Sequence, residues 1–220
     1  MSESMLLRAL GALLTYPRPE LVAALPEIGA VLAHAGNLPA AERAALAALV
    51  AEMQQSDALE LEERYVDMFD RGRATSLNLF EHLHGDSRDR GPAMVALMDV
   101  YARAGFRLTT KELPDFLPVV LEYLSCREHA EVVAMLADCA HILRSIGETL
   151  LARDSCYATV FATLLTIAGA DGLDRSRGGK AAASEPAFDD DWAEQPAFAP
   201  PADGAKTRGS TMHFIPPRHG

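Results

Sequence analysis

Apolar residues recur three and four positions apart along most of this chain, and no segment shows the sustained two-residue alternation of a half-buried strand. This spacing places apolar side chains on one face of an α-helix. The most regular series is Val132, Leu136, Cys139, Leu143, Ile146 and Leu150. It predicts one buried helix of about six turns, from residue 132 to residue 150, within an all-α fold.

Prolines divide the beginning of the chain into separate helices. Pro17 is expected to end a first helix, and Pro19 suits the first position of a second one. Pro26 lies inside this second helix and predicts a kink or a break, because proline has no N–H to donate. A third helix is expected over residues 40–55.

Capping signals define the next two helices. Asp57 with Glu60 matches a capping box and opens a fourth helix, which Gly72 ends. Thr75 or Ser76 is expected to cap a short fifth helix. Together with the later periodic segments, these signals predict an all-α, single-domain bundle of about nine helices.

The composition changes at residue 171, after which glycine, proline, alanine and charged residues dominate. Such a segment cannot bury enough apolar surface to offset the entropy lost on ordering. The expected organisation is therefore a helical domain over residues 1–170 and a disordered C-terminal tail over residues 171–220.

The charge and the cysteines indicate the partners and the compartment. A net charge of −11 repels phosphate backbones and anionic lipid, so neither nucleic acid nor direct membrane insertion is expected. No apolar run reaches the ~18 residues of a membrane span, and the N-terminus lacks the charge pattern of a signal peptide. The three cysteines form no C-x-x-C pair, which argues against a disulfide framework. These features predict a cytoplasmic protein.

An aromatic and methionine-containing surface is predicted near the middle of the chain. A short turn at Gly72 separates two groups of apolar residues, and two short helices that meet there can leave a groove for an amphipathic peptide helix. The alternative is that these residues close the core of the bundle. They are Tyr65, Met68, Phe69, Leu79, Phe80 and Leu83.

The same stretch contains two histidines that suggest a metal site, and a small helical metalloenzyme using His82, His84 and Asp86 is an alternative hypothesis. Residues two apart on a helix point in different directions, however, so both imidazoles do not readily meet one ion. H-E-x-x-H, the P-loop and G-x-S-x-G are all missing from the sequence. No metal and no cofactor is therefore expected.

Four arginines in this stretch alternate with acidic residues. Arginine can clamp a phosphate or a carboxylate through two parallel hydrogen bonds. The alternative is local pairing with Asp70, Asp86 and Asp89, and the sequence leaves both open. With the histidines, the arginines form a predicted polar rim consisting of Arg71, Arg73, His82, His84, Asp86, Arg88 and Arg90.

The motifs in this region resemble those of a known family. From residue 65 to residue 91 the chain contains, in order, YVDMFDRG, SLNLFEHLHG and DSRDRG, and from residue 112 it continues with ELPDFLPVVLEYLS. These motifs are similar to the signature of the NarJ family, within the wider TorD/DmsD group. The resemblance covers the helix layout of residues 5–170 and is closest over residues 61–125.

The resemblance implies a TorD-like helical fold and a chaperone function without enzymatic activity. NarJ proteins are assembly chaperones of respiratory nitrate reductase. The expected partner is the N-terminal segment of the apo catalytic subunit, held while its iron–sulfur cluster and molybdenum cofactor are inserted and before it docks at the membrane. A chaperone for another molybdoenzyme, such as a selenate, chlorate or sulfoxide reductase, remains an alternative.

The resemblance also implies particular site residues. The peptide-site motif of the wider group falls on Tyr65, Met68 and Phe69. The group's Asp-His pair falls on Asp115 and, in place of the histidine, Phe116, which puts any cofactor contact at this turn in doubt. Asp115 is then expected to meet a basic residue of the peptide, in agreement with the acidic character of the chain.

Overall fold

The computed structural model describes residues 3–85, 87–109 and 111–174. These residues are predominantly α-helical, and their β-structure is an isolated bridge between Asn78 and Phe116, which confirms the predicted all-α class. The elements in order are α1 (Glu3–Leu13), α2 (Pro19–Ala33), α3 (Ala40–Gln55), α4 (Ala58–Tyr65), the π-helix η1 (Val66–Asp70), the 3₁₀ helix η2 (Arg73–Thr75), α5 (Leu79–His84), α6 (Arg90–Arg103), α7 (Leu117–Leu124), α8 (His129–Asp138), α9 (Ala140–Ala152) and α10 (Ala158–Ile167).

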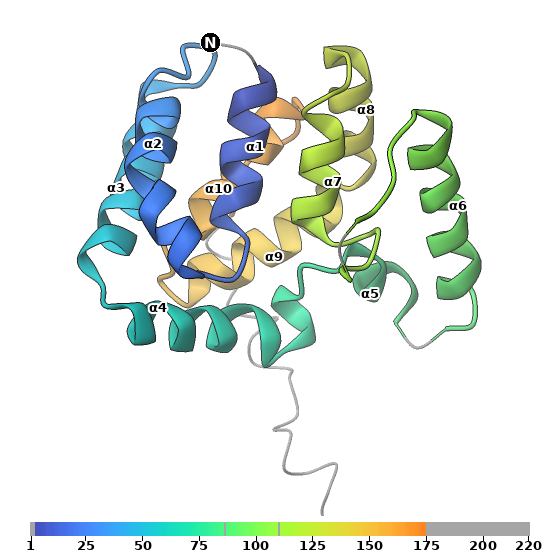
Figure 1. Cartoon of the computed structure of the whole chain (residues 1–220), viewed down its shortest axis with the longest axis horizontal. Coiled ribbons are helices and arrows are strands. Elements are labelled where there is room, and N and C mark those ends of the chain that lie inside the picture. The colour runs from blue at the N-terminus through green and yellow to red at the C-terminus, as the bar shows by residue number, and fades with distance from the viewer. Residues whose placement is uncertain (1–2, 86, 110, 175–220) are drawn as a thin grey trace, which may run out of the picture. The chain divides into compact units, whose positions relative to one another are not determined.

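Helix α1 is central to the packing of these residues. It lies beside α2 and α7, while α10 packs against α9 and α3 on the other side (Figure 1). Leu6, Leu7, Leu10 and Leu13 of α1 are all fully buried, as their spacing predicts. Burying a leucine side chain contributes roughly 1.5–3 kcal/mol to folding, so α1 is held firmly by its apolar face.

The predicted long helix over residues 132–150 is wrong at its middle. Helices α8 and α9 are separate, and the chain turns between them at Cys139, where φ is −91° and ψ is 0°. The apolar series itself is buried on both sides of the turn, from Val132 to Leu150. Periodicity reports which side chains face the core, but it does not require the helix axis to stay straight.

Helix α2 continues through Pro26 without a break. Pro26 is exposed, so water can hydrogen-bond the carbonyl that loses its helical partner there. The buried face of α2, with Leu25 and Ile28, stays intact.

Helix α4 begins as predicted and then changes its winding. The Glu60 N–H donates to Asp57 Oδ1 at 2.8 Å, which is the expected N-cap. The helix continues into the π-helix η1, in which one turn takes an extra residue. This change of winding directs Tyr65 and Phe69 into the core, where each is 5% exposed.

Helix α5 is positioned by long-range contacts and not by the predicted local caps. The residue before it is Asn78, whose side chain makes no capping bond. Instead, Leu79 N–H donates to the Asp115 carbonyl at 3.1 Å and Phe80 N–H donates to Asp115 Oδ2 at 2.8 Å. Leu117 N–H in turn donates to the Leu77 carbonyl at 2.8 Å. These bonds join the segments before α5 and α7 into one unit.

The last described residues pack against α9. Arg144 donates to the Asp171 carbonyl at 2.9 Å, and Asp174 N–H donates to Glu148 Oε1 at 3.2 Å. Leu173 is half-buried against the core. The rest of the predicted tail, residues 175–220, lies outside the described residues. In the described part of the chain, none of the helices has both the length and the apolar character needed to cross a membrane.

Candidate peptide-binding cleft

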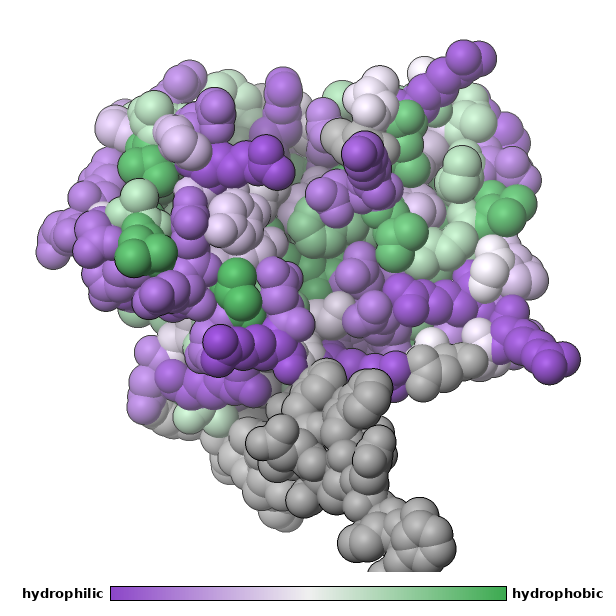
Figure 2. Space-filling view, turned by 60° about the horizontal axis from the view of Figure 1, so that its bottom comes forward, coloured by the Kyte–Doolittle hydropathy of each residue, from purple (hydrophilic) through white to green (hydrophobic). Residues whose placement is uncertain are grey.

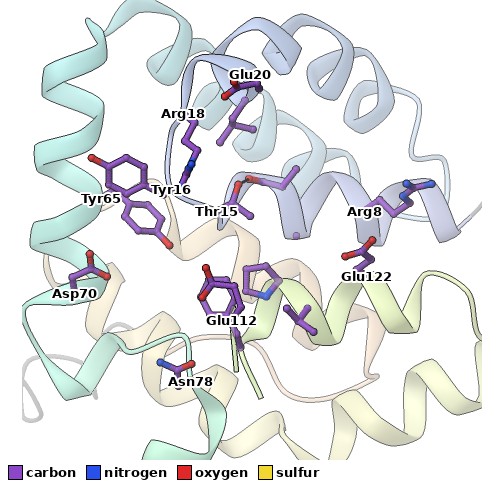
Figure 3. Close-up of a pocket in the computed structure, with 16 residues that line it drawn as sticks. Arg8, Thr15, Tyr16, Arg18, Glu20, Tyr65, Asp70, Asn78, Glu112 and Glu122 are labelled. Atoms are coloured by element: carbon purple, nitrogen blue, oxygen red, sulfur yellow. Dashed lines mark hydrogen bonds between the residues drawn. The ribbon is translucent and has the colours of Figure 1, made fainter. Parts of the chain in front are cut away.

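A cleft of about 780 Å³ opens between α1 and α7 and reaches α4 and η1 (Figure 3). We call it the α1–α7 cleft. Its walls come from segments far apart in the sequence that the packing of α1 on α7 brings together. The lining residues are Arg8, Gly11, Ala12, Thr15, Tyr16, Arg18, Glu20, Leu21, Tyr65, Asp70, Asn78, Glu112, Phe116, Pro118, Val119 and Glu122.

The cleft combines an apolar floor with an acidic edge. Figure 2 shows hydrophobic side chains in a hollow of the surface, surrounded by hydrophilic ones. Four acidic and two basic side chains line the cleft, so its formal charge is negative. Burial raises the pKa of the Asp70 carboxyl above its ordinary value, and a cation bound beside it would favour its charged form. The ionisable lining residues are Arg8, Arg18, Glu20, Asp70, Glu112 and Glu122.

A row of aromatic rings connects the cleft to the core. The ring of Tyr16, 37% exposed at the cleft, meets Tyr65 at 5.4 Å between centroids. Tyr65 meets Phe69 at 5.1 Å, and Phe69 meets Tyr157 at 5.1 Å. The Tyr65 hydroxyl donates to the Leu14 carbonyl at 3.0 Å, and burial raises the pKa of Tyr65. The cleft wall is therefore backed by tightly packed rings.

Of the predicted peptide-binding residues, Tyr65 and Phe116 line the α1–α7 cleft. Tyr65 presents little of its surface, since only 5% of it is exposed, whereas Phe116 is half-buried. Phe69 is also buried, one ring deeper in the row.

The remaining predicted apolar residues lie elsewhere. Leu79 is buried at the start of α5, and Met68 and Phe80 are half-buried against the core. Leu83, 48% exposed on α5, is the one with the most open surface. The structure thus does not bring all the predicted residues onto a single face, and their part in peptide binding stays a prediction.

Asp115 is completely buried. Its carboxylate accepts the Phe80 N–H, while its Oδ1 has no hydrogen-bond partner among the described residues. Burial raises the pKa of the Asp115 carboxyl. The Asp115 side chain therefore fixes the start of α5, and its contact with a basic residue of a peptide stays a prediction.

Two arginines of the predicted polar rim pair with residues other than those expected. Arg71 lies 3.6 Å from Asp67, one helical turn back, and Arg90 lies 3.1 Å from Glu81, which ties α6 to α5. Arg73 and Arg88 are exposed. The Arg71–Asp67 pair, whose two side chains are largely exposed, contributes little to stability.

The two histidines occupy different environments. A ring nitrogen of His82 lies 2.9 Å from the Ser76 carbonyl, and His84 meets the Phe80 ring edge-on at 5.6 Å. Asp86 lies outside the described residues. Among the residues that are described, no cluster of three or more potential ligands is placed to hold a metal ion.

Sequence reasoning missed most of the α1–α7 cleft. Tyr16 was interpreted only as the end of a helix, and Glu20, Glu112 and Glu122 were not considered as site residues. Tyr16 itself could have indicated the site. It is an aromatic residue directly before Pro17, in a turn between two helices, where an aromatic side chain is not needed for the core. The acidic residues give no local signal, because they meet only through the packing of α1, α2 and α7.

Comparisons with known proteins agree with the predicted family. Residues 35–163 match the family described as nitrate reductase delta subunit. The chain is 44% identical over 156 residues to the Escherichia coli K12 nitrate reductase molybdenum cofactor assembly chaperone NarJ. That match covers 71% of this chain and 66% of the E. coli protein.

More distant relatives extend the comparison. A probable chaperone of the same name from Bacillus subtilis is 32% identical over 71% of this chain and 84% of its own length. Among solved structures, a putative redox enzyme maturation protein from Archaeoglobus fulgidus has a similar fold. It aligns with a TM-score of 0.56 and 18% identity, over 76% of this chain and 93% of that one. The family match extends over more than half of the sequence, and the chain therefore belongs to the nitrate reductase delta subunit family.

Proposed function

We propose that this protein is an assembly chaperone for respiratory nitrate reductase that acts in the cytoplasm. Its client is the N-terminal segment of the apo catalytic, molybdenum-containing subunit, and the segment binds in the α1–α7 cleft. Holding it delays membrane docking until the iron–sulfur cluster and the molybdenum cofactor are inserted. The names of the relatives, which are assembly chaperones of nitrate reductase, support this choice of client.

The observation that carries the proposal is the combination of shape and charge in the cleft. An amphipathic helix can place its apolar side on Phe116, Val119 and Leu21, which line the α1–α7 cleft. Basic residues beside that stripe would meet Glu112 and Glu122 at the edge. A segment that is both apolar and basic is therefore the ligand of best fit.

Isothermal titration calorimetry with a synthetic peptide tests the proposal. The peptide carries about 15 residues from the N-terminus of the catalytic subunit, enough for about four helical turns. Saturable binding is expected, and Val119→Ala or Phe116→Ala is expected to weaken it about five- to tenfold by removing apolar contact in the cleft. Absence of saturable binding to the wild-type protein would contradict the proposal.

The matched control is Leu83→Ala, which shortens an exposed apolar side chain on α5, outside the cleft. Its affinity for the peptide should equal that of the wild type. If Leu83→Ala weakens binding and Val119→Ala does not, the binding surface lies at α5, where the sequence places it. Thermal melts of each variant separate lost contact from lost folding.

A further inference from the structure

A second cleft of about 640 Å³ lies next to the α1–α7 cleft. It runs along α4 and the beginning of η1, and we call it the α4 cleft. Four acidic and two basic side chains line it, the same balance as in the α1–α7 cleft. Its lining residues are Tyr16, Leu59, Glu60, Glu62, Glu63, Arg64, Val66, Asp67 and Arg71.

Tyr16 is the residue that the two clefts share. On one side of it, Tyr65 and Asp70 line the α1–α7 cleft, and on the other side Val66 and Asp67 line the α4 cleft. The α4–η1 segment thus forms part of both walls, and the Tyr16 side chain stands at the boundary between them. Figure 3 shows the Tyr16 ring beside that of Tyr65 at this point.

Two weak contacts hold Tyr16 in this position. Its ring meets Tyr65 edge-on, at an interplanar angle of 75°. Its hydroxyl faces the carboxylate of Glu62, a residue of the α4 cleft. Desolvation first, and this carboxylate second, raise the pKa of Tyr16. Tyr16 lies in the loop between α1 and α2, outside any helix. A side chain held in this way can change rotamer without disturbing the core.

We infer that Tyr16 limits the length of the client segment by separating two clefts that otherwise form one groove. The inference rests on the proposed function. A helix about 10 Å wide that rises about 1.5 Å per residue needs roughly 120 Å³ per residue, so the α1–α7 cleft holds roughly two turns. The α4 cleft adds room for roughly five residues more. A longer segment has to displace Tyr16, and this lowers its apparent affinity.

Both clefts are acidic, so the occupant of the joined groove is one continuous basic, amphipathic helix of the client. Its cations would face the Glu20 and Glu122 side in the first cleft, and the Glu62 and Glu63 side in the second. Arg64 is already paired with Glu60 at 2.8 Å, which leaves the charge of Glu62 and Glu63 uncompensated by that arginine.

The test compares two peptides from the N-terminus of the catalytic subunit, of about 7 and about 15 residues. Calorimetry on the full chain gives the ratio of their dissociation constants. Tyr16→Ala is expected to lower the ratio of the longer peptide's dissociation constant to that of the shorter peptide at least about fivefold. Tyr16→Phe, which loses the hydroxyl that interacts with Glu62 but retains the ring, should shift the ratio in the same direction by a smaller factor.

Leu113→Ala is the control, because this exposed side chain lines neither of the two clefts. An unchanged ratio in Tyr16→Ala, or equal loss for both peptides, overturns the inference while the proposed function stands. Failure of both peptides to bind the wild type overturns the two together. If Tyr16→Ala does not fold, the ratio for Tyr16→Phe decides, since an unchanged value there refutes the role of Tyr16.

Discussion

Asp115 shows how one side chain can position an element that is distant in the sequence. Its carboxylate accepts the Phe80 N–H, 35 residues away, from a site without solvent exposure. Burying a charge is unfavourable, and this is why the pKa of the Asp115 carboxyl is raised. Near neutral pH the buried, charged Asp115 side chain therefore lowers the stability of the fold, although its carboxylate accepts the hydrogen bond at the start of α5.

Two replacements of Asp115 distinguish the effect of its hydrogen-bond acceptor on stability from the effect of its buried charge. Asp115→Ala leaves Phe80 N–H without its partner and should lower the free energy of unfolding by about 1–3 kcal/mol. Asp115→Asn keeps an acceptor oxygen without the charge, and should be at least as stable as the wild type at pH 7. Urea denaturation of the three proteins gives these values. Equal stability of the Ala and Asn variants at pH 7 would show that the hydrogen bond is unimportant.

The pH dependence follows from the direction of the pKa shift. The folded state favours protonated Asp115, so the unfolded state releases its proton first as the pH rises above the ordinary value of 3.8. Wild-type stability relative to Asp115→Asn should fall from that pH up to the raised pKa and then stay constant. Denaturation series between about pH 4 and pH 7 measure this difference. A difference that does not vary with pH in this range would contradict the buried-charge interpretation.

The close contact between helices α9 and α10 depends on Gly147. A Cβ atom at this position would lie 2.9 Å from Cβ of Phe161 and 2.6 Å from Cδ2 of Leu173. The leucine tip can move, but the Phe161 Cβ is fixed to the backbone of α10. The missing side chain thus permits the close approach of the two helices.

Gly147→Ala should therefore destabilise the protein, although alanine favours helix. The overlap with Phe161 is expected to lower the free energy of unfolding by about 1–3 kcal/mol, more than the gain in helix propensity of about 1 kcal/mol. Differential scanning calorimetry measures the change. Gly36→Ala is the control, because a Cβ there meets no atom within 4 Å. A melting temperature of Gly147→Ala equal to that of the wild type would show that α10 moves away easily.

Residues 171–174 hold the last described part of the chain against the helical core. Leu173 packs on the core, Asp174 N–H donates to Glu148, and the Asp171 carbonyl accepts from Arg144. Truncation after residue 170 is expected to lower the melting temperature by several degrees more than truncation after residue 174. Thermal melts followed by circular dichroism compare the two. Identical melting temperatures would show that these contacts contribute nothing.

The acidic charge of the whole chain makes a prediction for binding. With a net charge of −11 and two acidic clefts, association with a basic client peptide should slow and weaken as salt is added. Stopped-flow or surface plasmon resonance measurements at about 0.05 M and about 0.5 M salt should show the decrease mainly in the association rate. A salt-independent rate would indicate that apolar contact alone selects the peptide.

The helical class and several local features can be predicted from short-range patterns in the sequence. Apolar spacing identified the buried face of α1, and the short-range pair of Asp57 and Glu60 identified the start of α4. These succeeded because a helix face and an N-cap depend on residues within a few positions of one another. The motifs over residues 65–125 likewise indicated the family that the comparison then showed.

The position of the cleft and the turns between helices arise from contacts between distant parts of the chain. The start of α5 depends on Asp115, 35 residues away from Phe80, and the two helices on either side of Cys139 both pack against α10. The cleft gathers Tyr16, Asp70 and Glu122 from three separate segments. A pattern along the chain cannot place such residues together, because their proximity arises from the packing of whole helices.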